Sequence, residues 1–406
     1  MHNLKTYSKN RSLSNNVDFV TIRFMLQLDR RILIHFDYLT PLLIAPLIAI
    51  SCWLIGEVNE NLVKKELSYI LIGSVVFIFA SIFPIRKFSW IIPIAYWLDI
   101  LLLISVKFFG TSILGAKRWL ALPFTSMTIQ PSELMKPAVL LMLAYLIQKC
   151  PPGNGGYNWK EFGKMSSFIL LPFVLIAIEP DLGSAMVVAL LGFGVLFLVG
   201  VKWKIWTTLI LLLGISSTFL YGGLKDYQKQ RILDFIGDKP SYHVQQSIIA
   251  IGSGGMAGKD KEDATQVQLK FLPIATTDFI FAYFIERFGF IGAAVLLTIY
   301  GALIIHILSL VSRFKNDLFG VVFASGIAIL LFIYVSINIS MTIGLAPVVG
   351  IPLPLFSYGG TSFMNFMILF GILQNLLAFR FDFLYNPNSR FFTKRKKEEK
   401  NLFLKD

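Results

Sequence analysis

YHVQQSIIAIGSGGMAGKDKEDATQVQLKFLPIATTDFIFAYFIERFGFIG, residues 242–292, joins a polar stretch to an apolar one. It begins as a polar loop, passes a glycine cluster and ends by carrying Asp278 into an apolar helix. A carboxylate at the mouth of a membrane helix is costly to bury, so Asp278 is a candidate functional group. Thr276, Thr277 and Asp278 are also good N-cap residues, so a purely structural role is equally open from the chemistry alone.

The composition indicates a membrane protein. The chain has 406 residues, 55% hydrophobic and 15% charged, with a mean hydropathy of +0.69. A soluble domain of this length carries more charge. Repeated apolar runs of near membrane-spanning length predict an all-α, polytopic membrane protein. The net charge of +13 comes from basic residues clustered between these runs, so topology explains it and no nucleic-acid partner is expected.

About ten apolar runs are predicted to cross the membrane. They cover residues 38–55, 67–83, 91–109, 136–148, 168–178, 182–201, 205–222, 279–310, 319–341 and 362–381. The eighth run exceeds the ~20 residues that a span needs, so it should tilt or project beyond the bilayer. A large extracytoplasmic loop is expected between the seventh and eighth runs. The predicted organisation is an N-terminal tail over 1–37, a transmembrane domain over 38–381 and a basic tail over 382–406.

Every second loop is basic, which sets the predicted orientation. The positive-inside rule places these loops and both termini in the cytoplasm, and an even number of spans requires the same. The other loops, over 110–135, 179–181, 223–277 and 342–361, then face outward and hold most of the unusual polar chemistry. Two cysteines and four scattered histidines indicate neither a disulfide framework nor metal-ligand spacing.

The first outward group lies in GAKRWLALPFTSMTIQPSELMKP, residues 115–137. Lys117 and Arg118 are adjacent, and Glu133 and Lys136 share a helix face if their turn is helical. A basic pair and a Glu–Lys pair at the membrane surface favour phosphate binding, because cations at this depth usually meet an anion. The alternative is an interfacial anchor with a local ion pair.

The second group is IEPDLGSAM, where Glu179 and Asp181 interrupt an apolar run. A tight outer turn explains the proline between them but not two acids. These carboxylates could bind a divalent cation, Mg²⁺ or Mn²⁺, or pair with Lys117, Arg118 or Lys136.

The third group opens the quoted stretch with amides and a hydroxyl, on Gln245, Gln246 and Ser247. Together with open backbone at Gly252–Gly255, these are the groups that sugar and pyrophosphate recognition needs. Glu286 lies eight residues after Asp278, on the same helix face and ~12 Å deeper. For Glu286 we expect a structural role, pairing with a cation inside the bundle.

The fourth group is GLAPVVGIPLPLFSYGGTS, residues 344–362. Its prolines forbid a regular helix. Irregular backbone at membrane depth must line a polar cavity or be buried in protein, so a re-entrant loop is predicted. Gly359 and Gly360 are expected to support this loop structurally.

Taken together, these residues resemble the SEDS family (shape, elongation, division and sporulation) of cell-wall proteins. The motifs GAKRWL, QPSE, EPDLGSA, AIGSGG, TQVQLKFLP, TDFIFA and PVVGIPLPLFSYGG occur in the family's order. They extend over residues from about 30 to 380. The TQVQLKFLP and PVVGIPLP forms are similar to the elongation members rather than to the division members.

The resemblance implies a peptidoglycan glycosyltransferase of the inner membrane that polymerises lipid II during cell elongation and maintains rod shape. It implies that Asp278, in TDFIFA, is the catalytic aspartate, and that Glu133 and Lys136 are functionally important. It also implies a class B penicillin-binding protein as the transpeptidase partner, with further membrane proteins of the elongation complex. No organic cofactor is implied.

Three positions depart from the family pattern. Ile274 stands where Glu is usual, Arg287 where a second acid is common, and Ser340 where Gly is usual. The first departure weakens any metal role at that loop. None of the three touches Asp278, Glu133 or Lys136.

The chemistry suits an inverting transfer. A sugar hydroxyl is too weakly acidic to attack unaided, so Asp278 would take its proton while nearby cations stabilise the leaving pyrophosphate. No carboxylate nucleophile is then needed. A lipid II flippase is the alternative, but a flippase needs polar groups accessible from both faces, and here they gather on the outer face. A purely structural scaffold leaves Asp278 unexplained.

Overall fold

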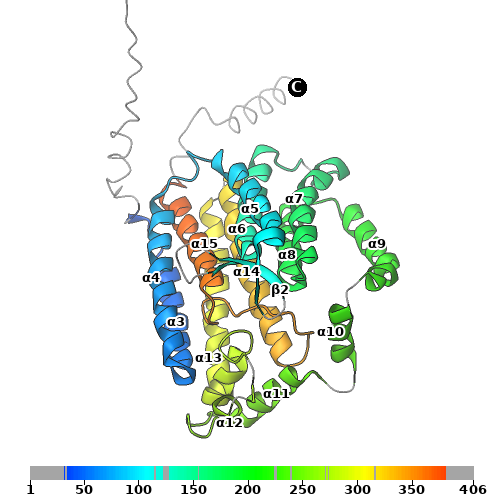
Figure 1. Cartoon of the computed structure of the whole chain (residues 1–406). Helices are drawn as coiled ribbons and strands as arrows, with labels where there is room; N and C mark the ends of the chain where they lie inside the picture. The colour runs from blue at the N-terminus through cyan, green and yellow to red at the C-terminus, as the bar shows by residue number, and fades with distance from the viewer. Residues whose placement is uncertain are drawn as a thin grey trace, which may run out of the picture.

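The computed structural model describes residues 32, 34–113, 116–121, 128–153, 155–223, 226–237, 240–269, 271–272, 274–314 and 317–380. Within them, long helices form a single bundle (Figure 1). These are α3 (Leu39–Val58), α4 (Glu60–Ile82), α5 (Ile91–Phe109), α6 (Pro131–Lys149), α7 (Trp159–Ile178), α8 (Leu182–Val199), α9 (Trp203–Gly222), α13 (Ile280–Val311), α14 (Leu318–Thr342) and α15 (Gly360–Ala378). A short 3₁₀ turn, Ser312–Phe314, ends α13.

Each of the ten predicted runs corresponds to one of these helices, so the prediction of a polytopic helical membrane protein is confirmed. In the part of the chain that the structure describes, eight helices are long and apolar enough to cross a membrane by themselves. The other two are α6, which carries Glu133, Lys136 and Lys149, and α9, whose apolar part is Trp203–Ser216. The tail over 382–406 and nearly all of the tail over 1–37 lie outside the described residues.

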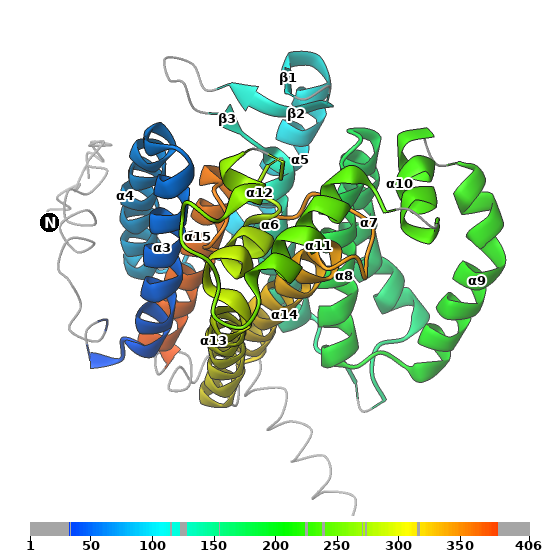
Figure 2. The same cartoon turned by 90° about the horizontal axis from the view of Figure 1, so that it is seen from below.

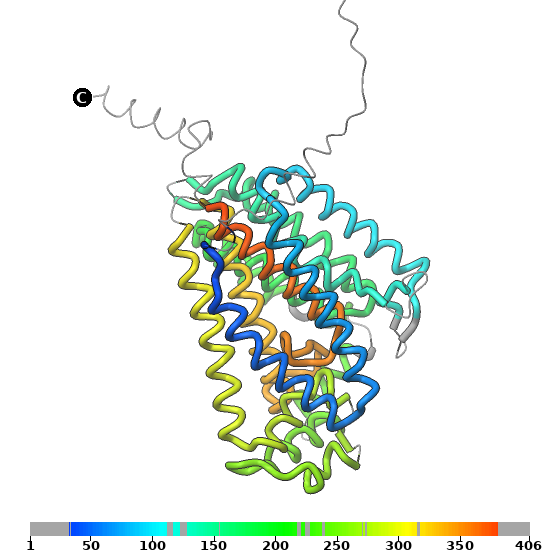
Figure 3. Tube along the Cα trace, turned by 90° about the vertical axis from the view of Figure 1, so that its left-hand side faces the viewer, coloured from blue at the N-terminus to red at the C-terminus, as the bar shows by residue number. Residues whose placement is uncertain are grey.

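The centre of the bundle is formed by α6, α14 and α15. In the most apolar stretch of α14, 72% of the residues are buried, and in that of α15, 83% are buried. The corresponding share in α4 is 17%, so α14 and α15 are enclosed by protein. Figure 3 shows α15 lying along α4. The helices at the periphery keep exposed apolar faces, as a lipid environment requires.

The helix α9 lies at the edge of the bundle and diverges from the other long helices along most of its length (Figures 1 and 2). Near its start, the ring of Trp206 meets the rings of Phe162, Phe193 and Phe197, with centroids 5.8 to 6.4 Å apart. Farther along, the apolar side chains from Ile210 to Leu213 are more than half exposed. The aromatic cluster therefore anchors α9 at one end only.

The long segment between the seventh and eighth runs was expected to begin as a polar loop, and this expectation is wrong. It folds into α10 (Asp226–Ile236), α11 (Tyr242–Gly254) and the single turn α12 (Thr265–Gln268). The helix α11 packs against α13. Its apolar residues Val244 and Ala250 are buried, and so is Ser247. The stretch is therefore an amphipathic helix whose buried face packs against α13.

Open backbone was expected at Gly252–Gly255, and this is correct only in part. A Cβ on Gly252 or Gly255 would meet open space, whereas Gly254, and Gly258 after the cluster, lie in close contact with the backbone of α13. A Cβ on Gly254 would lie 2.1 Å from the carbonyl oxygen of Ile285, and one on Gly258 would lie 2.2 Å from that of Arg287. On the α13 side of the contact lies Gly289, whose φ of +63 is a conformation that residues with a side chain rarely adopt. Only glycine allows α11 and α13 to approach this closely.

The non-helical dihedrals of Gly289 also divide α13 into two parts. At this kink the N–H of Phe290 donates to the carbonyl of Gly255 at 2.9 Å, and that of Ile291 to Met256 at 3.1 Å. The excess length of the eighth run is taken up here, because the residues before Gly289 pack with α11 rather than extending a straight span.

Two glycines of α11 provide a matched test of this contact. A Cβ on Gly252 has no atom within 4 Å, whereas Gly254 is blocked by backbone. We expect Gly252→Ala to leave the protein as stable or to stabilise it by about 0.5–1 kcal/mol, since alanine favours helix. Gly254→Ala should lower the unfolding temperature of the purified chain. Equal unfolding temperatures for the two variants would contradict the close contact.

A small sheet joins α5 to α6 and was not predicted. It consists of β1 (Thr111–Ile113), β2 (Ala116–Ala121) and β3 (Thr128–Ile129), antiparallel in the order β1-β2-β3 (Figure 2). The strand β2 carries Lys117 and Arg118. The sheet therefore projects the basic pair from a fixed backbone.

Candidate active site

Asp278 lies in the turn that precedes α13. The helix begins at Ile280, its N-cap is Phe279, and no side chain caps it. The interpretation of Asp278 as a hydrogen-bonded cap is therefore not what the structure shows. Its side chain is half-buried at the entrance of the helix.

The turn is held by the irregular segment between α14 and α15. The amide of Asn338 donates to the carbonyl of Asp278 at 2.9 Å and to that of Ile351 at 2.8 Å. The hydroxyl of Ser357 donates to the carbonyl of Thr277 at 2.6 Å. These bonds fix the backbone around Asp278 without engaging its carboxylate.

The same segment confirms the prediction of irregular backbone buried in protein. Ile351, Leu353 and Phe356 are almost completely buried, although no helix or strand is present over 343–359. Gly350 has φ +75, and a Cβ there would lie 3.4 Å from Oδ2 of Asp278. This glycine brings the loop directly against the carboxylate.

Burial raises the pKa of Asp278 to about 6, and the charges of Arg231 and Arg118 oppose that rise. The group is thus a stronger base than an exposed aspartate but remains ionised near neutral pH. Arg118 comes from β2 and Arg231 from α10, so segments far apart in the sequence converge on this turn.

Arg118 is fixed by the turn between α7 and α8. Its guanidinium lies 3.7 Å from Oδ1 of Asp181 and donates to the carbonyl of Pro180. Asp181 Oδ2 also accepts from Gln130 at 2.9 Å and from Ser132 at 3.2 Å. The predicted pairing of this acid with a basic residue of the first group is therefore present, and it is made by Arg118. Lys117 is exposed on the same strand.

Glu179, two residues before Asp181, is buried, and its Oε2 has no hydrogen-bond partner among the described residues. Burial, Asp181 and Asp99 raise its pKa to about 8, against the charge of Arg118. Among the residues that the structure describes, no three His, Cys, Asp or Glu side chains converge on one point. With Asp181 engaged, Glu179 alone does not make up a donor set for a divalent cation. That expectation stays untested, and no step below uses a metal.

Glu133 and Lys136 lie on one face of α6, as predicted, and both are buried. The Lys136 ammonium donates to Glu133 Oε1 and to the hydroxyl of Tyr334. Tyr334 donates to Glu133 Oε2 at 3.1 Å, and Asn365 does so at 3.4 Å. The phosphate-binding role of this pair stays a prediction, because in this arrangement the ammonium is enclosed.

The helix α14 connects this cluster to the turn of Asp278. Tyr334, which bonds the Glu133–Lys136 pair, and Asn338, which bonds the Asp278 carbonyl, are four residues apart and share a helix face. A change at the buried pair can therefore reach the Asp278 turn through a single turn of α14.

The third group divides between the surface and the core. Gln245 is exposed and Gln246 half-buried, whereas Ser247 is fully buried and its hydroxyl donates to the carbonyl of Thr342 at 2.7 Å. In this conformation Ser247 fastens α11 to the end of α14. Its predicted contact with substrate is untested.

The residues expected to give structural support do contact neighbouring elements. Glu286 Oε1 accepts from the backbone N–H of Gln266 at 3.1 Å, so it holds the turn of α12. Among the described residues it makes no ion pair within 4 Å, unlike the role expected for it. Gly359 is the N-cap of α15, and a Cβ on Gly360 would lie 2.5 Å from the ring of Tyr69.

Arg287, a departure from the family pattern, has a specific partner. Its Nε and one terminal nitrogen donate to the two carboxylate oxygens of Glu57, each at 2.8 Å. Tyr283 donates to the same carboxylate at 2.7 Å, and Arg287 also donates to the carbonyl of Lys259. A two-pronged ion pair thus ties the end of α3 to the first part of α13.

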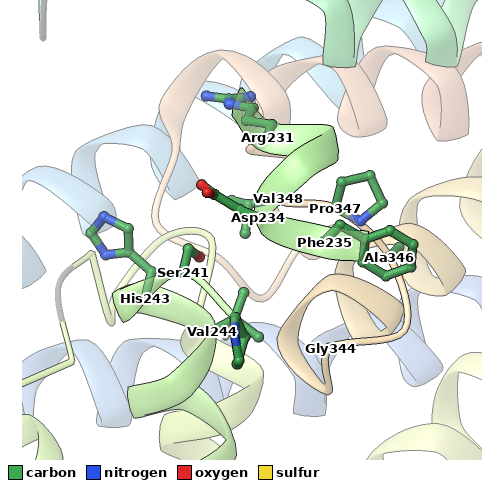
Figure 4. Close-up of a pocket in the computed structure, with 11 residues that line it drawn as sticks. Arg231, Asp234, Phe235, Ser241, His243, Val244, Gly344, Ala346, Pro347 and Val348 are labelled. Atoms are coloured by element: carbon green, nitrogen blue, oxygen red, sulfur yellow. The ribbon is translucent and has the colours of Figure 1, made fainter. Parts of the chain in front are cut away.

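The sequence did not single out Arg231 or His243, which the structure brings to the Asp278 turn. Both line a pocket of ≈ 280 Å³ between α10, α11 and the segment after α14 (Figure 4). The ring of His243 stacks on that of Phe279, with centroids 6.2 Å apart. The amphipathic pattern of α10 was the available signal, since it marks an ordered helix in a segment assigned to loop.

Comparisons with known proteins agree with this architecture. The family FtsW/RodA/SpoVE, described as "Cell cycle protein", matches residues 26–381. Peptidoglycan glycosyltransferase MrdB of Helicobacter pylori is 52% identical over 90% of this chain and 96% of its own length. MrdB of Escherichia coli K12 is 37% identical over 86% and 95%.

Two solved structures share the fold. A chain of a peptidoglycan synthase complex that coordinates polymerization and crosslinking has a TM-score of 0.75 at 26% identity, covering 85% of this chain and 98% of its own. The Thermus thermophilus Rod shape determining protein RodA has a TM-score of 0.65 at 25% identity, with the same coverage. The chain belongs to the FtsW/RodA/SpoVE family, the SEDS proteins. Its relatives place it with the RodA type, as the motifs indicated.

Proposed function

We propose that this chain polymerises lipid II into glycan strands on the outer face of the membrane, with Asp278 as general base. The coarser function, a peptidoglycan glycosyltransferase of the RodA type, is the one that relatives at 52% and 37% identity carry in their names, and it confirms the prediction from the motifs. The rod-shape role follows from the same relatives.

The observation that carries the proposal is the setting of Asp278. Its backbone is fixed by Asn338, its carboxylate is left to react, and two arginines stand nearby. In the transfer, the acceptor hydroxyl gives its proton to Asp278 while its oxygen forms the bond to the anomeric carbon. The bond from that carbon to the diphosphate breaks, and its electron pair leaves with the diphosphate. Attack opposite the leaving group inverts the configuration.

The test is a gel of glycan strands made by the purified full chain from lipid II, with and without a transpeptidase. Strands made by the chain alone would support the enzyme. A lipid II flippase, the alternative, would move lipid II across vesicles and make no strands.

The partner we propose is a class B penicillin-binding protein, joined by other membrane proteins of the elongation complex. The support is the neighbour from a complex that couples polymerization to crosslinking. Nothing in the described residues of this chain suggests a second, peptide-crosslinking site.

The pH dependence of the reaction follows from the pKa of Asp278. A general base must be deprotonated, and a pKa of about 6 leaves it ionised above that pH. We expect kcat/KM for strand formation to fall about tenfold per pH unit below pH 6 and to be level just above it. A profile that stays level from pH 7 to pH 5 would assign the base to another group.

The proposed orientation places both termini and the loop after α6 in the cytoplasm. Cys150 in that loop is exposed, and Cys52 in α3 is the only other cysteine of the chain. In a Cys52→Ser variant, a membrane-impermeant maleimide should label Cys150 only after the cells are permeabilised. Labelling in intact cells would reverse the topology and place Asp278 inside.

A further inference from the structure

An apolar crevice lies at the far end of α13 from the Asp278 turn. It encloses ≈ 410 Å³, within the ~300–1,000 Å³ that ligand pockets usually have. The helix α14 packs against both α8 and α13, and the crevice is lined by the end of α8, the end of α13, the start of α14 and one proline of the loop after α6. In the proposed orientation this end of the bundle faces the cytoplasm.

The crevice runs from the surface of the bundle into its interior. At its rim, Leu198 of α8 and Leu308 of α13 are 56% and 45% exposed. Farther in, Val195 of α8 and Val322 of α14 are almost completely buried. Apart from Ser325, every described side chain that lines the crevice is apolar. Such a space suits a hydrocarbon chain, because water inside it would find almost no hydrogen-bond partners.

Two exposed cations flank the crevice along the chain. Lys202 comes three residues after Val199, which lines the crevice, and its Cε lies 3.7 Å from where a Cβ on Gly155 would stand. Arg313 lies in the short turn between α13 and α14, two residues after the last lining residue of α13. Within the described part of the chain, neither of the two side chains has a hydrogen-bond or ion-pair partner.

The acids described at this end of the bundle are already engaged and do not neutralise these cations. They are Asp37, which is bonded to His306, Glu161, which accepts from the backbone N–H of Asn158, and Asp317, which is paired with Arg86. Burial lowers the pKa of Arg380 at the end of α15, and the charge of Arg313 lowers it further, so the positive potential extends to that helix. An anion is therefore attracted to this end of the bundle.

We infer that the crevice binds an anionic phospholipid, with an acyl chain against Val195 and Val322 and the headgroup phosphate held by Lys202 and Arg313. In the proposed orientation this lipid belongs to the inner leaflet, whose anionic headgroups attract basic residues. The basic tail over 382–406 is a poorer occupant, because its cations at 394–397 would meet like charges. The inference does not rest on the proposed reaction, since binding is measured without lipid II.

The test measures the Kd of phosphatidylglycerol and of phosphatidylcholine for the purified full chain in uncharged detergent, by native mass spectrometry. Each basic residue near an anionic headgroup contributes a factor of about 5, so phosphatidylglycerol should bind about 30-fold more tightly. Lys202→Gln combined with Arg313→Gln should abolish this preference and leave the Kd of phosphatidylcholine unchanged. Inorganic phosphate should not compete, because it has no chain to place in the crevice.

Val321→Trp tests the apolar part of the site. Val321 is partly exposed and lines the crevice, so tryptophan occupies space that the acyl chain needs. At a factor of about 4 per CH₂ group displaced, the loss of two or three such groups weakens binding of both lipids roughly 10- to 60-fold. The matched control is Ala294→Trp, in a second apolar groove of ≈ 390 Å³ that no charged residue lines, and it should leave both Kd values unchanged.

The matched control for the cations is Lys160→Gln combined with Lys164→Gln. It removes the same charge from the same end of the bundle, on α7, which does not line the crevice. The preference for phosphatidylglycerol should remain about 30-fold in this variant. Thermal unfolding shows that each variant is folded, and phosphatidylglycerol should raise the unfolding temperature of the wild type more than phosphatidylcholine does.

Three results would overturn the inference. One is an equal Kd for the two lipids in the wild type, or a preference that the α7 variant loses as completely as the Lys202 and Arg313 variant. Another is wild-type affinity in folded Val321→Trp. The third is binding of phosphatidylglycerol that appears only after residues 382–406 are removed, because the tail would then be the occupant of the crevice.

Discussion

Asp278→Asn should abolish glycan strands while the protein still inserts and folds. The asparagine keeps the size of the side chain, and the bonds that hold the turn run to backbone atoms, from Asn338 to the Asp278 carbonyl and from Ser357 to the Thr277 carbonyl. Only the basicity is lost. General bases contribute roughly 100- to 10,000-fold, so single-turnover polymerisation at matched abundance should fall by that factor.

The matched control for this experiment is Asp263→Asn, an exposed acid between α11 and α12 that does not line the pocket. It should polymerise lipid II at the wild-type rate. If Asp278→Asn made glycan strands at close to the wild-type rate, Asp278 would have only a structural role, since asparagine and aspartate cap helices about equally well.

Removal of the Glu133–Lys136 pair should have the second largest effect. Lys136→Met alone leaves Glu133 buried and unpaired, which costs about 3–5 kcal/mol of stability. The double variant Glu133→Gln with Lys136→Met removes both charges and should recover most of that loss, because a neutral replacement of a buried pair is often close to neutral. Unfolding temperatures of the two purified variants measure this directly.

The same double variant separates stability from function. If the pair supports the donor site, through Tyr334 and the face of α14 that also holds the Asp278 turn, strand formation should fall roughly 100- to 1,000-fold in a stable protein. A double variant that is stable and polymerises at a near wild-type rate would reduce Glu133 and Lys136 to a packing role.

The ten long helices could be predicted because a run of apolar side chains indicates where it is buried, in lipid or in protein. Even α6, which carries three charged residues, was predicted as a helical run, because the loops on either side of it were recognisable. The irregular segment after α14 was predictable for the same local reason, because its prolines exclude a helix.

The helix α11 could not be predicted from local pattern, whereas the amphipathic pattern of α10 was an available signal. The sequence of α11 is moderately polar, and its buried face exists only because α13 lies against it. Nor did the sequence reveal that the carbonyls of Ile285 and Arg287 occupy the space where a Cβ would stand on Gly254 and on Gly258. Asp278 was found because it interrupts an apolar run, but Arg231 and His243 reach it only through the folding of α10 and α11.

The ion pair between Glu57 and Arg287 has a consequence for how the chain is made. The two residues are 230 positions apart, so the end of α3 enters the membrane long before its partner is synthesised. Until α13 follows, Glu57 lies at the end of an apolar helix without the guanidinium of Arg287, and this ion pair between α3 and α13 is not yet formed. A chain that stops before residue 287 therefore lacks the ion pair that ties the end of α3 to α13.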